Sequence, residues 1–210
     1  MASIFDNIQW VVQRNLTSRS DFERLEASCN KVGVAFIEVD IIPFEPRLPE
    51  FDKSRNSIIY GSTTFNKLAA EDVNLRPGLF FDEYNFSMQN YIEKWGRYML
   101  NYDAVVTTFN QLIDGDRYNS DKLLFIRPND DSKPFAGEVK RFDEIVEWYE
   151  KLKVIENTNL SLDTSIIVSE PYNIQYEWRL WIVNKKVIAA SKYREYFKLR
   201  KEEGCPEAVA

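Results

Sequence analysis

Two stretches of the sequence place cations and carboxylates at spacings that suit a polyphosphate ligand. In the first, Arg127 ends an apolar run, and Lys133 and Gly137 follow in the polar loop PNDDSKPFAG. Phosphate groups are bound by positive charge and by backbone that approaches closely at a glycine. The alternative is a solvated loop in which the two cations pair with Asp130 and Asp131. The local sequence leaves both interpretations open.

The second stretch carries two glutamates seven residues apart. Glu170 stands where an apolar run stops at a proline, and Glu177 lies near the start of the alternating segment YEWRLWIV. Because side chains alternate along a strand, Glu177 and Arg179 share a face and would project together into one small-molecule slot. Tyr193 and Arg194 on the returning segment would add donors to it. The alternative is a surface Glu–Arg ion pair, which contributes little to stability.

Missing residue types narrow the chemistry. The sequence has no histidine, which excludes a Ser-His-Asp triad, histidine-ligated zinc and imidazole acid–base catalysis. The P-loop pattern GxxxxGK[ST], the dinucleotide pattern GxGxxG and the nucleophile elbow GxSxG are also absent. Any catalysis must therefore use carboxylates, Lys, Arg, Tyr, Ser, Cys or a bound cofactor.

Composition indicates an ordinary globular protein of one large or two small domains. The 210 residues are 44% hydrophobic and 29% charged, with a net charge of -6. The negative charge disfavours nucleic acid and anionic lipid as partners. No run approaches the ~18 apolar residues of a membrane span, and Cys29 and Cys205 match no metal or redox spacing. We therefore expect a cytoplasmic protein with reduced thiols and no membrane contact.

Helices and strands alternate in the first half of the predicted fold. A capping box at Ser20 and Glu23 predicts a helix that stops near Gly33, and a strand follows over 34–42. A second strand, the Gly61-Ser62 turn and a helix make a βα unit. The clearest helix runs from residue 87 to 99, and we interpret its apolar face as core packing. That face consists of Met88, Tyr91, Ile92, Trp95, Tyr98 and Met99.

The second half has an antiparallel character. After a strand over 103–109 we place the domain boundary at the turn 114–116. Strands are predicted over 122–127 and 164–170, with a helix between them, and a hairpin over 176–193 turns at Asn184-Lys185. The predicted fold class is thus mixed α/β and α+β: an α/β domain in residues 1–115, then an antiparallel domain in residues 116–210.

Together these positions resemble the ATP-grasp superfamily, and specifically its bacterial and phage branch, long filed as a domain of unknown function. The stretches that carry the resemblance are FIRPNDDSKPFAGEV, IIVSEPYNIQYEWRLWIV and VIAASKYR. IIYGS and PGLFFDEYNF in the first half resemble the domain that precedes the grasp, so the likeness spans most of the chain.

The resemblance implies roles for individual residues. Arg127, Lys133 and Gly137 match the segment that covers the ATP phosphates. Glu170 matches the carboxylate of the adenine-side hinge, and Glu177 the carboxylate that meets the ribose. Arg179 fits an arginine near the phosphates, and Arg194 is the position expected to hold the acyl phosphate or the acceptor. Arg179 and Arg194 are thus the expected catalytic residues.

The resemblance also implies a reaction and its cofactors. ATP-grasp enzymes use ATP and Mg²⁺ to phosphorylate a carboxylate, and an amine or thiol then attacks the acyl phosphate. The carboxylate and amine substrates here are unknown, with a peptide or protein among the options. The family's magnesium ligands lie on late strands for which we find no counterpart before the sequence ends at GCPEAVA. We therefore expect no metal ligand within these 210 residues, and either a truncated chain or a shortened relative would account for that.

A non-catalytic role is the alternative from another class. In it, a degenerate phage-type ATP-grasp protein binds a host macromolecule through its scaffold. The aromatic residues between 80 and 86 would then offer a contact surface.

Overall fold

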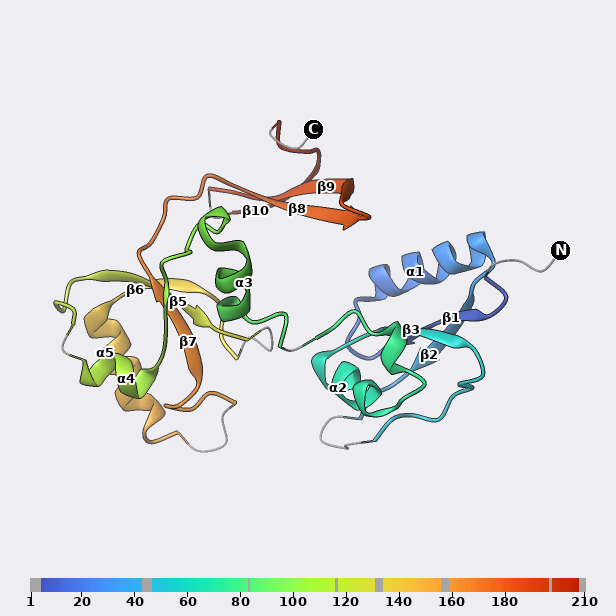
Figure 1. The fold of residues 1–210 in the computed structure, drawn as a ribbon, viewed down its shortest axis with the longest axis horizontal. Helices are drawn as coiled ribbons and strands as arrows, with labels where there is room; N and C mark the ends of the chain where they lie inside the picture. The colour runs from blue at the N-terminus through green and yellow to red at the C-terminus, as the bar shows by residue number, and fades with distance from the viewer. Residues whose placement is uncertain are drawn as a thin grey trace.

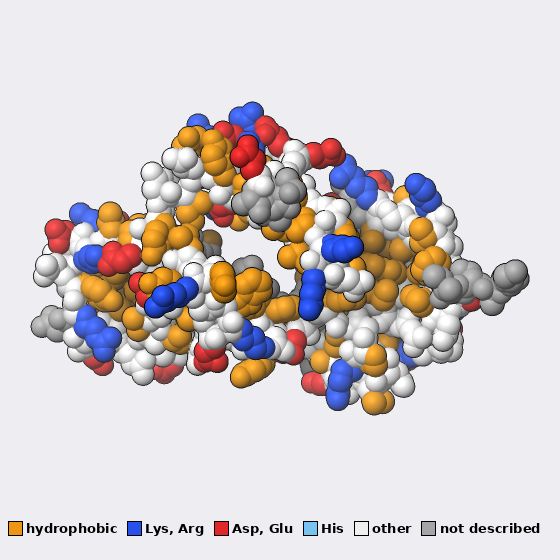
Figure 2. Space-filling model, turned by 45° about the horizontal axis from the view of Figure 1, so that its top comes forward, with side chains coloured by type: hydrophobic (Ala, Val, Ile, Leu, Met, Phe, Trp, Pro, Cys, Tyr) orange, Lys and Arg blue, Asp and Glu red, His pale blue; other side chains and the backbone are white. Residues whose placement is uncertain are grey.

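The computed structural model describes residues 5–42, 47–82, 84–115, 117–130, 134–155, 159–196 and 198–207. Three sheets divide the described chain, as Figure 1 shows: a parallel first sheet, an antiparallel second sheet and a third sheet built from the last strands. In the space-filling view of Figure 2, they surround an open hollow with hydrophobic side chains along its rim. The predicted mixed fold class is confirmed.

The first sheet has the order β2-β1-β3 and is entirely parallel. Its strands are β1 (Ile8–Gln13), β2 (Ala35–Val39) and β3 (Asn56–Tyr60). Helix α1 (Arg19–Val32) connects β1 to β2, and α2 (Thr63–Glu71) with the 3₁₀ turn η1 (Arg76–Gly78) follows β3. Their apolar side chains form one core, which includes Val11, Val39, Ile59, Phe65 and Leu75.

Two details of this lobe differ from the sequence prediction. The central strand β1 was not predicted, because its fully buried Gln9 and Gln13 interrupt the apolar pattern. Helix α1 is capped by Ser18 rather than Ser20, since the Ser18 hydroxyl accepts a hydrogen bond from the Asp21 N–H at 3.2 Å.

The helix predicted over 87–99 is shorter than its apolar pattern suggests. Helix α3 (Met88–Trp95) ends at Gly96, which adopts a φ of 49°, and the 3₁₀ turn η2 (Gly96–Tyr98) follows. Met88 is buried, but Trp95 is 58% and Tyr98 91% exposed. The interpretation of the whole stripe as core packing was therefore wrong for its C-terminal half, because the left-handed glycine turns the chain away.

The second sheet has the order β4-β7-β5-β6 and is antiparallel throughout. Its strands are β4 (Val105–Thr108), β5 (Leu123–Pro128), β6 (Glu138–Arg141) and β7 (Ser165–Ser169). Helices α4 (Phe109–Asp114) and α5 (Phe142–Leu152) pack on one face in a core that includes Phe109, Leu124, Ile126, Ile145 and Val168. Strand β6 was not predicted, because its charged sequence EVKR lacks an apolar pattern.

The boundary predicted at 114–116 stays a prediction. Strand β4 and helix α4 precede it in the sequence, yet β4 pairs with β7 and α4 contributes Phe109 and Leu112 to the core of the second sheet.

The third sheet has the order β10-β9-β8. Strands β8 (Tyr176–Val183) and β9 (Lys186–Glu195) form the predicted hairpin, and Asn184 and Lys185 turn it with φ values of 49° and 64°. Strand β10 (Lys198–Glu203) was not predicted, since its sequence KLRKEE is almost wholly charged. Within the described residues, no helix is long and apolar enough to span a bilayer.

Candidate functional site

The face of the second sheet that points away from α4 and α5 holds the first predicted cation. Arg127 on β5 pairs with Ile167 on β7, and Phe125 pairs with both Ser169 and Val139. Because directly paired residues share a face of a sheet, these side chains form one surface, which we call the outer face. Ile167 is fully buried and Val139 is 48% exposed. The outer face is thus an apolar platform with a guanidinium on the same strand.

Gly137 lies against this platform. A Cβ atom at Gly137 would stand 3.0 Å from Cζ of Phe125 and 3.4 Å from Cβ of Arg127. Only a glycine lets the backbone approach the outer face so closely. The structure therefore brings Gly137 and Arg127 together, whereas Lys133 lies outside the described residues.

Replacing Gly137 with alanine is expected to lower the free energy of unfolding by about 1 kcal/mol, since the loop or the Phe125 ring must shift to admit the methyl group. Urea denaturation of the variant and the wild type would measure the loss. A Phe125→Leu/Gly137→Ala double variant is the control, because leucine lacks the ring atom that the new methyl group meets. Costs that simply add in this double-mutant cycle would contradict the proposed contact.

The end of β5 also anchors α3. The Asn129 backbone oxygen accepts a hydrogen bond from the Met88 N–H at 2.8 Å, and the Asn129 side-chain oxygen accepts one from the Gln89 N–H at 2.9 Å. The first turn of α3 is therefore tied to the strand that carries Arg127.

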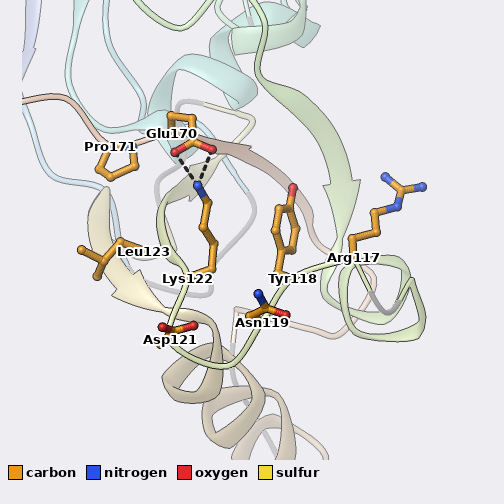
Figure 3. A pocket seen from close by; sticks show the side chains of 8 residues that line it. All are labelled: Arg117, Tyr118, Asn119, Asp121, Lys122, Leu123, Glu170 and Pro171. Atoms are coloured by element: carbon orange, nitrogen blue, oxygen red, sulfur yellow. Dashed lines mark hydrogen bonds and ion pairs between the residues drawn. The ribbon is translucent and has the colours of Figure 1, made fainter.

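Glu170 follows β7 and forms an ion pair that the sequence did not predict. Its carboxylate oxygens lie 2.7 and 2.8 Å from the Lys122 ammonium nitrogen. In Figure 3 the Lys122 side chain reaches across to Glu170, while Arg117 points away from the pair. The two residues border a pocket of about 510 Å³. Its lining consists of Arg117, Tyr118, Asn119, Asp121, Lys122, Leu123, Glu170 and Pro171.

This pocket adjoins the outer face, because Leu123 lies on that face two residues before Phe125 and also lines the pocket. The Glu170 side chain is 59% exposed and that of Lys122 39%, so the pair is accessible to a ligand. Sequence reasoning missed Lys122, whose only signal was its position directly before the β5 apolar run.

Glu177, Arg179 and Arg194 come together around one tyrosine of the third sheet. The Tyr193 hydroxyl donates a hydrogen bond to Oε2 of Glu177 at 2.5 Å, and Nη1 of Arg194 lies 3.4 Å from Oε1 of the same carboxylate. The guanidinium carbons of Arg179 and Arg194 lie 5.4 and 5.8 Å from the centre of the Tyr193 ring. We call these four residues the Tyr193 cluster.

The predicted site residues thus fall into three groups. Arg127 and Gly137 share the outer face, Glu170 pairs with Lys122 at the pocket, and the remaining three belong to the Tyr193 cluster. Among the described residues, no contact of Glu170 with Glu177 brings the two glutamates together in a single slot, and the slot stays a prediction. Nor does the described part of the chain hold a group of three or more acidic or cysteine side chains that could bind a metal ion.

Comparison with known proteins identifies the second half of the chain. No curated protein matches the sequence. An ATP-grasp domain family, the second family of its clade, matches residues 103–210. The matched segment begins just before β4 and includes the second and third sheets, with all seven predicted site residues. It covers just over half of the 210 residues, and the chain therefore belongs to this family of ATP-grasp domains.

Proposed function

We propose that this chain is an ATP-grasp ligase-like protein that binds ATP along the outer face of the second sheet and residues 170–177. The observation that carries the proposal is the outer face itself. It combines an apolar platform around Phe125 with the Arg127 guanidinium and a closely apposed glycine backbone at 137. A flat apolar surface suits a nucleobase, and a guanidinium next to closely approaching backbone suits phosphate.

The other groups complete this assignment. Glu170 follows β7 directly and stands in the hinge position, where its backbone and carboxylate would meet the adenine. Glu177 offers a carboxylate for the ribose hydroxyls. Among the described residues, no carboxylate pairs with Arg179, whose five N–H donors would be available to the triphosphate. Lys133 would add a further cation to the segment that covers the phosphates.

The proposed reaction joins a carboxylate to an amine or thiol. A carboxylate oxygen attacks the γ-phosphorus of ATP, ADP leaves, and the amine or thiol then attacks the acyl carbon and expels phosphate. Arg179 and Arg194 would stabilise the negative charge that grows on the transferred phosphoryl group. No histidine is needed for either step. The proposal includes an N-terminal pre-grasp domain, a cytoplasmic location and membership of the phage and bacterial branch.

Magnesium is not accommodated by the described side chains. They contain no acidic cluster that could ligate it, so we derive no step of the reaction through a protein-bound metal. Mg²⁺ usually keeps several waters and binds the substrate phosphates, and it would reach this site as the complex with ATP.

Isothermal titration calorimetry with ATP and MgCl₂ tests the proposal. We expect saturable binding of about one nucleotide per chain with a Kd of micromolar order, as is common for small-molecule substrates. Circular dichroism of the same sample establishes that it is folded. A folded sample that releases no heat with ATP, in the presence or absence of Mg²⁺, would overturn the proposal.

A second function is favoured by one observation, the exposure of aromatic side chains between residues 80 and 102. Phe80 and Tyr84 are each 74% exposed, and Tyr98 is 91% exposed. Such a surface would suit a non-catalytic protein that binds a macromolecule. A Lys133→Glu variant separates the functions: the ligase-like protein would lose nucleotide affinity, whereas the binding protein would keep its partner and show no nucleotide effect.

A further inference from the structure

Strand β9 has an extra residue opposite Glu177. Glu177 pairs with Arg194, whereas the next residue, Trp178, pairs with Lys192, so the register shifts by one at Tyr193. Such a β-bulge sets two consecutive residues of one strand opposite a single residue of the other. Both Tyr193 and Arg194 therefore reach the Glu177 carboxylate.

The Tyr193 hydroxyl restrains the Glu177 carboxylate. Its hydrogen bond of 2.5 Å ends on Oε2, and a bond to a charged acceptor is stronger than one between neutral groups. Oε1 has only the long contact of 3.4 Å with Arg194. The carboxylate is thereby held in one orientation and keeps lone pairs available on both oxygens for a second donor, such as a pair of sugar hydroxyls.

The Tyr193 ring restrains the arginines by a different contact. Cation–π attraction holds a guanidinium over the ring face, and here it engages Arg179 at 5.4 Å and Arg194 at 5.8 Å. This contact uses none of the N–H donors of Arg179, in contrast to an ion pair with a carboxylate. The guanidinium is thus oriented while its donors remain available to an anion.

We propose that Tyr193 is a positioning residue for nucleotide binding, whose hydroxyl fixes Glu177 for the ribose and whose ring fixes Arg179 and Arg194 for the phosphates. This inference rests on the proposed function and adds a residue that no motif in the sequence assigned. The protonation state supports it: burial, followed by the hydrogen bond to Glu177, raises the pKa of Tyr193 above its ordinary value. The phenol therefore remains a donor throughout the neutral range.

Two variants separate the hydroxyl from the ring. Tyr193→Phe removes the hydrogen bond and keeps the ring, and Tyr193→Leu removes both. Calorimetry would measure the affinity of each protein for ATP and for 2′,3′-dideoxy-ATP, which lacks the ribose hydroxyls. Tyr176→Phe is the matched control, since the Tyr176 ring lies in the same sheet beside Tyr196, with 5.8 Å between ring centres, and outside the cluster.

We expect Tyr193→Phe to lower ATP affinity about 5-fold, roughly 1 kcal/mol, and to leave dideoxy-ATP affinity within about 2-fold. Tyr193→Leu should weaken both nucleotides about 10-fold or more, because the arginines also lose their support. The preference of the wild type for ATP over the dideoxy analogue should therefore disappear in Tyr193→Phe, an effect that a general loss of stability would not produce.

Other results would overturn the inference. If the wild type binds ATP and Tyr193→Phe binds both nucleotides as the wild type does, or loses both equally, the positioning role is wrong and the proposed function stands. If the folded wild type binds neither nucleotide, the proposed function fails and the role of Tyr193 fails with it.

Discussion

An Arg127→Met variant is expected to bind ATP about 30-fold more weakly than the wild type, a loss of roughly 2 kcal/mol. Arg127 lies in the middle of the outer face, paired with Ile167 and close to Gly137. A guanidinium forms charge-assisted hydrogen bonds with phosphate oxygens, and methionine keeps the length of the side chain without the charge. Calorimetric titration of both proteins with ATP would measure the ratio of dissociation constants.

Arg200→Met is the matched control for this prediction. Arg200 lies on strand β10, is also partly exposed, and pairs with Glu202 and Glu195. Its removal lowers the positive charge of the chain by the same amount, away from the outer face. Equal ATP affinities for Arg127→Met and wild type, or equal losses for the two arginine variants, would show that Arg127 makes no specific contact with the phosphates.

Gly78→Ala is expected to lower the free energy of unfolding by about 3 kcal/mol, at the upper end of what overpacking costs. A Cβ atom at this position would lie 1.6 Å from the backbone oxygen of Ser57 and 2.7 Å from its carbonyl carbon. Ser57 belongs to β3, so the obstacle is backbone and cannot rotate away. Either η1 or the edge of the first sheet must move. Urea denaturation followed by tryptophan fluorescence would measure the loss.

Gly33→Ala provides a comparison in the same lobe. Gly33 ends helix α1 with a φ of 77°, and among the described residues no atom lies within 4 Å of the position that a Cβ atom would take there. Alanine at this position is strained only by its backbone conformation, at a cost of about 1 kcal/mol. If Gly78→Ala costs no more than Gly33→Ala, the close approach of η1 to β3 does not exist in solution.

Periodic apolar patterns predicted the elements that build the second and third sheets. Helix α5 buries Phe142, Ile145, Tyr149 and Leu152 from one face, as its spacing indicated, and β8 begins and ends at the predicted residues. The strands that the sequence did not reveal are those whose apolar pattern is interrupted. Gln9 and Gln13 in β1 are polar but fully buried, because Gln9 bonds to Ser57 and Gln13 to the Ser62 N–H. Such long-range partners cannot be read from a local window.

The candidate site shows the same division. Spacing and alternation placed Glu177 and Arg179 on one face, and their shared contacts with Tyr193 agree with that prediction. Tyr193 could be proposed only as a further donor, because a strict period of two takes no account of a bulge that shifts the register. Lys122 was not predicted because its partner, Glu170, is distant in sequence.

Strand β4 and helix α4 have a consequence for dividing the chain into separately expressed parts. Both precede residue 115, yet β4 covers one edge of β7, and Phe109 contacts the rings of Phe135 and Trp148. A fragment that began at residue 116 would lack this strand and this ring. It would present the backbone donors and acceptors of β7 to solvent as a new sheet edge, which is a template for pairing with other molecules. Residues 103–115 therefore belong, in any dissection of this protein, with the half that carries the nucleotide site.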